Sequence, residues 1–383
     1  MKKITIIGAG IGGLTTAIAL KKQGFEVEIF EQSKEFTNAG SGILLAPNAM
    51  QVFKTIAVYN DVLQMGNYVK RLKAVTKNLS TLSNMEYKKF EDEYGVKTIA
   101  IHRATLHKVL MSHLSDIPIH VNKKVESVYQ ENEEVQISFT DGSHHKTELL
   151  IGADGLHSPI RKSIFNNTSL RDSGQVCWRG ISEIKLNGGL EEELNECWGK
   201  GKRFGFVRIS YNQIYWFAVL NKKQYPDSNT NLTSAFELFH PTILNLIKST
   251  PAEKIIHNEI WDLKPIENWF SGNICLLGDA AHATTPNMGQ GAAQAIESAL
   301  ALSLCLKESP DNTQKAFQRY QELRKEKANY ITNTSWRIGK IAQTNNTVLC
   351  ILRNLISKVM PASVMEKQNK KVYDINTYSR PLI

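Results

Sequence analysis

At 383 residues, the chain is too long for one small domain and suits one large domain with an insertion, or two domains. Apolar residues make up 42% and charged residues 22%, a composition that excludes a disordered or collagen-like protein. The net charge of +9 favours an anionic ligand, nucleic acid or an anionic membrane surface. Because lysines are mixed with acids, as in residues 88–93, we favour a solvated basic surface over a nucleic-acid site.

The five cysteines are odd in number and include no CxxC pair. This pattern favours free thiols in a reducing compartment, here the cytoplasm, over a disulfide framework or a metal site. No apolar stretch is long enough to span a bilayer. We therefore expect neither a metal centre nor a transmembrane helix.

The first elements form a β–turn–α–β unit. Residues 3–7 are apolar and β-branched, which predicts a fully buried strand. Residues 14–23 have helical spacing and end at Gly24, and residues 26–32 predict a second strand. A glycine-rich turn joins the first strand to the helix.

The rest of the chain has three distinct patterns. Residues 102–114 predict a helix, and residues 123–155 predict a β-meander. Between residues 175 and 265, short alternating strands and four tryptophans predict an antiparallel sheet with an aromatic face. From residue 291 onward the pattern is helical.

The N-terminal turn fits the pattern G-x-G-x-x-G between a strand and a helix. Gly8 permits the tight turn, Gly10 lets a pyrophosphate approach the backbone, and Gly13 lets the helix pack closely on the sheet. Glu31 ends the second strand, where it can accept a hydrogen bond from a ribose hydroxyl. The motif predicts FAD or NAD and disfavours NADP; the alternative is a glycine-rich turn without a ligand.

A second glycine-rich turn lies almost the whole chain away. Asp279 follows an apolar strand, where a carboxylate can accept hydrogen bonds from a sugar alcohol. Pro286, Gly289 and Gly291 then form a turn without bulky side chains, against which a flat ring could lie at a helix N-terminus. This turn favours FAD over NAD, although on its own it would be better interpreted as a helix cap and a packing loop.

Three segments together resemble the fingerprints of a known family. They are GAGIGGL, LLIGADGLHSPIRKSI and LLGDAAHATTPNMGQGAAQAIESA. In order and spacing they resemble, over nearly the whole chain, the single-component flavin-dependent aromatic hydroxylases, the para-hydroxybenzoate hydroxylase-like class A monooxygenases. The middle segment, with Asp154, Gly155, Ser158 and Arg161, serves both FAD and the nicotinamide cofactor in that family. From its residues alone, it could equally be a capped turn.

The resemblance implies an α/β fold: a three-layer, Rossmann-like FAD-binding domain, an inserted antiparallel-sheet substrate domain and a C-terminal helical segment. It implies an FAD-binding domain of residues 1–70, 101–174 and 266–330, a substrate domain of residues 71–100 and 175–265, and a helical segment of residues 331–383.

The resemblance also implies which residues bind FAD. These are Gly8, Gly10, Gly12, Gly13, Glu31, Gln32, Leu44, Arg103, Val125, Asp154, Asp279, Pro286, Gly289 and Gly291. Arg103 corresponds to an arginine that reaches the FAD diphosphate, and Val125 to a position whose backbone meets adenine; Arg103 could instead be a surface arginine at a helix start. We interpret His282 as a structural hydrogen-bonding residue rather than an acid–base catalyst.

The implied reaction uses NADH or NADPH, O₂ and an aromatic or heteroaromatic small molecule, which a flavin hydroperoxide hydroxylates. Arg203 and Tyr215 resemble substrate-facing residues of urate hydroxylase-like members, and we predict that they are catalytic. The alternatives are a solvent-facing arginine and a tyrosine packed in the sheet. Trp178 and Trp216 could line the substrate site or fill the core; we expect one of them to be in the core.

The C-terminal region predicts an amphipathic helix. We favour packing of this helix on the body or on a partner in a homodimer over adsorption to a membrane surface, and we expect a monomer or homodimer. Its apolar positions are Val348, Ile351, Leu352, Leu355, Ile356 and Val359, while Arg353 and Lys358 fall elsewhere.

Two other functions compete with a monooxygenase. One is a flavoprotein of the same fold and different chemistry, such as an isoprenoid reductase or an antibiotic-modifying hydroxylase. The other is a non-catalytic FAD-binding protein, against which the intact turn from Asp279 to Gly291 argues.

Overall fold

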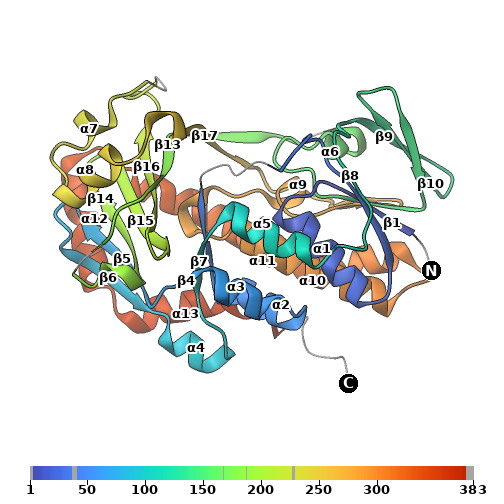
Figure 1. Ribbon diagram of the computed structural model, residues 1–383, viewed down its shortest axis with the longest axis horizontal. Helices are drawn as coiled ribbons and strands as arrows, with labels where there is room; N and C mark the ends of the chain where they lie inside the picture. Colours follow the sequence, from blue (N-terminus) through green and yellow to red (C-terminus); the bar gives the residue numbers. More distant parts are fainter. Residues whose placement is uncertain (1–2, 37–40, 167, 187, 227–228, 377–383) are drawn as a thin grey trace.

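The computed structural model describes residues 3–36, 41–166, 168–186, 188–226 and 229–376. Figure 1 shows two large sheets toward opposite ends of the molecule, with long helices between them. One sheet belongs to the glycine-rich end of the chain, and the other contains the aromatic strands. The site lies where these two parts face each other.

The first sheet is built around β1 (Lys3–Ile7), and four of its five residues are buried. Strands covered on both faces read as continuous apolar runs, which is why this segment could be recognised as a buried parallel strand. The sheet order is β18 (Phe270–Ser271), β19 (Ile274–Leu276), β12 (Leu149–Gly152), β1, β2 (Glu26–Phe30) and β8 (Ile119–His120), with only β18 antiparallel to its neighbour.

Helices and a small sheet cover this parallel sheet. Helix α1 (Ile11–Lys22) packs against α10 (Gly291–Glu308) and α5 (Arg103–Ser112). The antiparallel sheet β11 (His144–Thr147), β10 (Glu134–Phe139) and β9 (Val125–Glu131) packs against α6 (Pro159–Ile164). The three-layer arrangement predicted from the sequence is therefore present (Figure 1).

The predicted boundaries of the first unit needed correction. Helix α1 begins at Ile11, three residues before the predicted start, and β2 ends at Phe30, two residues before the predicted end. Glycines 12 and 13 are weak helix formers, so local propensity argues for a later start. Packing of α1 against the sheet and α10 overrides that propensity.

The second large sheet has seven strands. Its pairs are antiparallel, except that β14 and β5 are parallel, which corrects the expectation of a wholly antiparallel sheet. The order is β17 (Ile256–Leu263), β13 (Leu170–Ser182), β16 (Gln213–Asn221), β15 (Lys202–Ser210), β14 (Glu193–Trp198), β5 (Arg71–Thr76) and β6 (Thr81–Glu86).

The two faces of this sheet have different environments. Trp178 and Trp216 both lie in a buried cluster with Phe204 and Phe206, so both fill the core, whereas we expected only one to do so. Helices α7 (Leu232–Ala235) and α8 (Pro241–Lys248) contribute residues to that cluster. Because side chains alternate along a strand, Arg203 and Val207 of β15 lie on the opposite face.

The remaining elements connect the two sheets. Helix α11 (Thr313–Ala342) runs between them, and α12 (Thr347–Val359) lies at the outer edge of the molecule (Figure 1). The others are β3 (Gly42–Leu45), β7 (Ile99–His102) and β4 (Asn67–Tyr68), which form a small sheet, together with α2 (Pro47–Thr55), α3 (Tyr59–Met65), α4 (Lys88–Tyr94), α9 (Asp279–His282) and α13 (Ala362–Tyr373).

Helix α12 does not pack on the body through its apolar positions, which corrects one half of our preferred interpretation; packing on a partner in a homodimer stays a prediction. Its apolar side chains are exposed, and Arg353, which we placed off the apolar face, is buried. The body offers backbone carbonyl groups at this position, which bind a guanidinium rather than leucines.

Candidate active site

The glycine-rich turn between β1 and α1 has the backbone geometry that a dinucleotide phosphate requires. Gly8 has a φ of 105°, and its amide donates to the Phe30 carbonyl oxygen at 2.7 Å. A Cβ on Gly13 would lie 1.9 Å from the Gly8 carbonyl oxygen, so only glycine permits this packing. Gly10 is exposed and a Cβ there would contact nothing, which leaves the N-terminus of α1 open to a ligand.

Glu31 lies beside this turn at the end of β2. Its Oε2 accepts from the Ala9 amide at 2.7 Å, and its Oε1 accepts from the Ser33 amide at 2.8 Å. The two bonds fix the carboxylate next to the turn, where its remaining lone pairs can accept from a ribose. Gln32, the next residue, is exposed at the same edge.

Two further residues lie on this side of the site. Val125 begins β9, and the segment before it is joined to β2 because the Lys123 amide donates to the Glu31 carbonyl oxygen at 2.8 Å. His107 of α5 donates from Nε2 to the Ala9 carbonyl oxygen at 2.9 Å. We did not identify His107 from the sequence, because only the packing of α5 on α1 brings it to the turn.

The loop after β12 is built as a capped turn. Gly155 has a φ of 82°, and the Ser158 hydroxyl accepts from the Arg161 amide at 2.8 Å at the start of α6. The buried Arg161 guanidinium donates to the Ala280 carbonyl oxygen at 2.9 Å, which joins this loop to the third motif. Burial raises the pKa of Asp154, and its buried Oδ1 has no hydrogen-bond partner among the described residues.

The third motif presents backbone and a carboxyl group to solvent. Asp279, Pro286 and Gly289 are exposed, and Gly291 begins α10. Although the Asp279 side chain is accessible, protein atoms crowd around it, and this desolvation raises its pKa. The positive charge of Arg103 opposes that rise, so Arg103 lies within electrostatic reach of Asp279.

The first and third motifs meet in space. A Cβ on Gly12 and a Cβ on Gly278 would each lie 3.1 Å from the Cβ of Ala295 in α10. A side chain at either position would crowd Ala295, so the two glycines let the turn after β1 lie close to the turn after β19. Two segments almost 270 residues apart in the chain, as 278 − 12 = 266, thus form one continuous surface.

Arg103 connects this surface to the seven-stranded sheet. It is exposed at the first position of α5. Burial raises the pKa of both Asp279 and Tyr215, and the positive charge of Arg103 opposes the rise in each case. Arg103 thus acts on both the Asp279 carboxyl group and the Tyr215 phenol. A guanidinium at this position is suited to holding a diphosphate.

Tyr215 lies on the face of the seven-stranded sheet that is turned toward the parallel sheet and its glycine-rich turns. A Cβ on Gly42 of β3 would lie 2.5 Å from the ring, so β3 packs directly against it. Burial raises the pKa of Tyr215, and the positive charges of Arg179 on β13 and of Arg103 oppose that rise. We did not identify Arg179 from the sequence. Arg179 pairs with Phe217 of β16, and because side chains alternate along a strand, Phe217 and Tyr215 lie on the same face, so Arg179 lies there too.

The Arg203 guanidinium is buried, and each of its three nitrogens donates a hydrogen bond. It donates to Gln343 Oε1 at 2.9 Å, Glu196 Oε1 at 3.0 Å, Gln175 Oε1 at 3.1 Å and Asn287 Oδ1 at 2.6 Å. Asn287 belongs to η3 (Pro286–Met288), the turn of the third motif. Arg203 thus holds the turn against the sheet, and its predicted direct contact with substrate stays a prediction.

Apolar side chains surround Tyr215 and η3. They come from both parts of the molecule and belong to one cluster, which we call the apolar lining: Leu44, Leu72, Ile181, Leu194, Tyr215 and Met288. Met288 belongs to η3, so the lining lies beside the turn that we expect to contact the flavin ring. An apolar ring system fits such a lining better than a charged one does.

His282 has the structural role that we expected. It is buried, and its Nε2 lies 2.9 Å from the Ser298 hydroxyl of α10. Burial lowers the pKa of His282 to about 3, which keeps the imidazole neutral at physiological pH. It fixes α9 against α10 behind the site.

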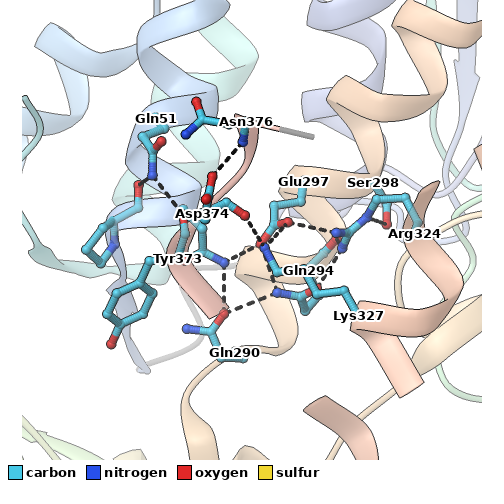
Figure 2. Close-up of polar contacts among 12 residues, drawn as sticks. Gln51, Gln290, Gln294, Glu297, Ser298, Arg324, Lys327, Tyr373, Asp374 and Asn376 are labelled. Carbon is cyan, nitrogen blue, oxygen red and sulfur yellow. Dashed lines mark hydrogen bonds and ion pairs between the residues drawn. The ribbon is translucent and has the colours of Figure 1, made fainter. Parts of the chain in front are cut away.

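A buried polar network supports the start of α10 (Figure 2). Gln290 Oε1 accepts from Asn48 of α2 at 2.9 Å and from Gln294 at 3.2 Å. Glu297 then accepts from Arg324 at 2.7 Å and from Lys327 of α11 at 2.8 Å. The network therefore ties the Gly289–Gly291 turn to two other helices.

These features define a class of protein. A parallel sheet with a glycine turn after its central strand binds a dinucleotide, and a second bare turn beside it provides room for a flat ring. The exposed Gly10 and Gly289 backbones, the Glu31 carboxylate and the Arg103 charge fit the pyrophosphate, ribose and ring of FAD. The fold and site are those of a flavoprotein.

The comparisons with known proteins identify the family. The chain belongs to the family described as FAD binding domain, whose model matches residues 1–335. The chain is 35% identical to the aurachin C monooxygenase/isomerase of Stigmatella aurantiaca, and the match covers 96% of this chain and 97% of that protein. The 2-heptyl-3-hydroxy-4(1H)-quinolone synthase of Pseudomonas aeruginosa is 29% identical over 97% of both chains.

A solved structure has the same fold. Klebsiella pneumoniae HpxO, complexed with FAD and uric acid, superposes with a TM-score of 0.88 at 23% identity, over 98% of each chain. The protein is thus an FAD-dependent monooxygenase of the aromatic hydroxylase type, with NADH or NADPH as the reductant. FAD supplies the redox chemistry and the activation of O₂ when it is bound.

Proposed function

We propose that the protein hydroxylates a bicyclic N-heterocycle that carries an apolar side chain, with a 4-quinolone as the model substrate. The observation that carries this proposal is the contrast within the site: the Tyr215 phenol belongs to the apolar lining and also lies within electrostatic reach of the Arg179 guanidinium. The pair suits the single ring oxygen of a quinolone, and the lining suits its hydrocarbon parts. The name of the Pseudomonas aeruginosa relative, which describes a heptyl-bearing hydroxyquinolone, supports the same class.

Each residue has a defined part in this proposal. The raised pKa of Tyr215 keeps its hydroxyl protonated, so it can donate to the ring oxygen of the substrate. Arg179 stabilises the partial negative charge on that oxygen. The apolar lining excludes water and orients the ring. Arg203 positions η3 through Asn287, and Asp279, Pro286, Gly289 and Gly291 contact the cofactor.

We also propose that the enzyme works in a reducing compartment, the cytoplasm. All five cysteines are free thiols, and four of them are buried.

A substrate series tests the proposal. Purified holoenzyme is supplied with NADH or NADPH and with 2-heptyl-4(1H)-quinolone, 4(1H)-quinolone or urate, and hydroxylated product is measured by mass spectrometry. We expect the heptyl compound to have a kcat/KM about tenfold or more above that of the bare ring, because a buried alkyl chain contributes several methylene groups of binding energy. Faster turnover of urate than of either quinolone would contradict the proposal.

Tyr215→Phe tests the polar contact. Loss of one hydroxyl that donates to a substrate oxygen should lower kcat/KM for the quinolone by roughly tenfold while FAD stays bound. Tyr211→Phe, in the exposed turn between β15 and β16, is the matched control and should leave kcat/KM unchanged. An unchanged kcat/KM in Tyr215→Phe would show that the hydroxyl does not contact the substrate.

A further inference from the structure

Helix α12 is amphipathic, but its apolar face points away from the body. Val348 is 71% exposed, Leu355 is 55% exposed and Val359 is 75% exposed. Arg353 is only 6% exposed. An ordinary surface helix buries its apolar stripe and exposes its charges, so α12 is reversed. The exposed apolar positions of α12, which we call its outer face, are Val348, Leu349, Ile351, Leu352, Leu355, Ile356, Val359 and Met360.

Specific contacts hold α12 in this reversed orientation. The Arg353 guanidinium donates to the Ala342 carbonyl oxygen at 2.7 Å and to the Gly199 carbonyl oxygen at 3.3 Å. It also lies 5.2 Å from the centre of the Trp198 ring. Rotation of the helix to bury its leucines would break these bonds and leave two carbonyl groups unpaired. The body thus fixes the outer face toward the surroundings.

The chain segment that contains α12 is basic, and this charge favours an anionic occupant. Between Glu326 and Glu366 the chain has no acidic residue, while it contains Lys327, Arg337, Lys340, Arg353 and Lys358. Arg337, Lys340 and Lys358 are exposed. A second copy of this chain, which also carries a net charge of +9, would bring like charges together at such a face.

The dimensions of α12 suit a helix that lies on a membrane. Thirteen residues make a helix of about 20 Å, which is shorter than the roughly 30 Å of a bilayer core. Within the described residues, no single helix has the length and apolar composition to cross a membrane; the bent pair Thr347–Val359 and Ser363–Tyr373, at 87°, meets that criterion only when taken together, and by length and composition alone.

We propose that the outer face of α12 docks on the surface of an anionic phospholipid bilayer. The apolar side chains enter the boundary between head groups and acyl chains, and the flanking lysines and arginine contact lipid phosphates. The helix lies parallel to the membrane plane, with Arg353 on the side away from it. This proposal rests on the orientation of α12 and not on the proposed substrate.

Vesicle binding tests the proposal on the full-length holoenzyme. Protein is mixed with vesicles of phosphatidylcholine alone or with about one third phosphatidylglycerol, and the fraction that sediments with the vesicles is measured. We expect binding to the anionic vesicles, weaker binding to the neutral ones, and a loss of binding as salt is raised. Protein that stays in the supernatant with anionic vesicles overturns the proposal.

Substitutions show whether α12 carries the binding. Leu352→Ser with Leu355→Ser should weaken binding at least tenfold, because two exposed apolar anchors are lost. Lys340→Glu with Lys358→Glu should weaken binding to anionic vesicles by a similar factor. Leu238→Ser removes a leucine that is 69% exposed elsewhere and should change nothing.

Two results would overturn the assignment. One is equal vesicle binding by the Leu352→Ser/Leu355→Ser protein and the unsubstituted protein. The other is a dimer in light scattering that becomes a monomer of 43.1 kDa in that variant, which would make the outer face a protein interface. An unchanged flavin spectrum confirms that each variant is folded.

Discussion

At the scale of single residues, Arg203 shows how a buried cation can organise a site. Its guanidinium is shared among four side chains from β14, β13, the end of α11 and η3. Such a group costs free energy to bury unless each N–H has a partner, and here each nitrogen has one. Removing it leaves several buried acceptors unpaired.

We predict that Arg203→Ala loosens the turn of the third motif. Asn287 loses its 2.6 Å bond, so η3 is no longer held against the sheet, and FAD binding should weaken roughly tenfold. FAD affinity is measured by titrating the apoprotein and following flavin fluorescence. Arg208→Ala on the same strand, where the Arg208 side chain donates to Asn67 Oδ1 at 2.8 Å, is the control and should bind FAD within about twofold of the parent. Full FAD affinity with loss of substrate-stimulated turnover would instead favour direct substrate contact.

His282 makes stability depend on pH. Its pKa is lowered to about 3 in the folded protein, against about 6.5 in an unfolded chain. The unfolded state therefore binds a proton that the folded state excludes. The contribution of His282 to stability is complete above about pH 6.5 and is lost as the pH falls toward about 3.

We predict that His282→Gln flattens this dependence. From pH 7.5 to pH 5, the free energy of unfolding of the parent should fall by about 2 kcal/mol through this group, and the variant should lack that loss. Urea unfolding at the two pH values measures it. His144→Gln, at an exposed position, should behave like the parent. The same slope in His282→Gln and in the parent would refute the assignment.

At the scale of elements, the start of α10 depends on charges buried between helices. Glu297 and Arg324 are both fully buried and form a 2.7 Å ion pair, with Lys327 at 2.8 Å from the same oxygen (Figure 2). Removing the acid leaves two cations without their counter-charge in the interior. The network reaches Gln290, so its loss also affects the turn.

We predict that Glu297→Gln lowers the free energy of unfolding by about 3–5 kcal/mol, the usual result of breaking a buried pair. Thermal and urea unfolding measure this loss. The control is Glu322→Gln on α11, where an exposed pair with Arg319 at 3.7 Å should contribute no more than about 0.5 kcal/mol. Equal effects of the two substitutions would contradict the structure.

Elements with a strong periodic signal were predictable. The strand over residues 3–7 and the start of α10 at Gly291 follow from local patterns and were confirmed. The start of α1 was not, because packing overrides the low helix propensity of glycine.

The site was predictable only in part, for a physical reason. The conformation of a glycine-rich turn depends mainly on the residues of the turn itself, so the two motifs could be found in the sequence. The burial of Arg203, the position of Arg179 and the reversed orientation of α12 depend on strand register and on partners far along the chain. The local sequence pattern does not show which distant residues become those partners.

At the scale of the whole molecule, function requires that distant segments form one site. The turn after β1 and the turn after β19 meet at Ala295, and the seven-stranded sheet brings Tyr215 toward them through Arg103. We predict that one FAD molecule spans both turns, with its ADP half at Gly10 and its ring at Gly289. A Cβ at either glycine would contact nothing, so neither substitution disturbs the packing around it. Gly289 has a φ of 62°, so a substitution there also strains the backbone, whereas Gly10 has no such conformation.

The most direct measurement is the number of FAD molecules per chain in the parent, in Gly10→Asp and in Gly289→Asp. We predict one FAD per chain in the parent. Each variant should lose most of it while keeping the circular dichroism of the parent apoprotein, because a carboxylate repels the diphosphate at one turn and occupies the place of the ring at the other. The unfolding midpoint of the apoprotein should be unchanged in Gly10→Asp and slightly lower in Gly289→Asp, because an aspartate at a φ of 62° is strained. Full FAD occupancy in either folded variant would show that the two turns do not hold one cofactor.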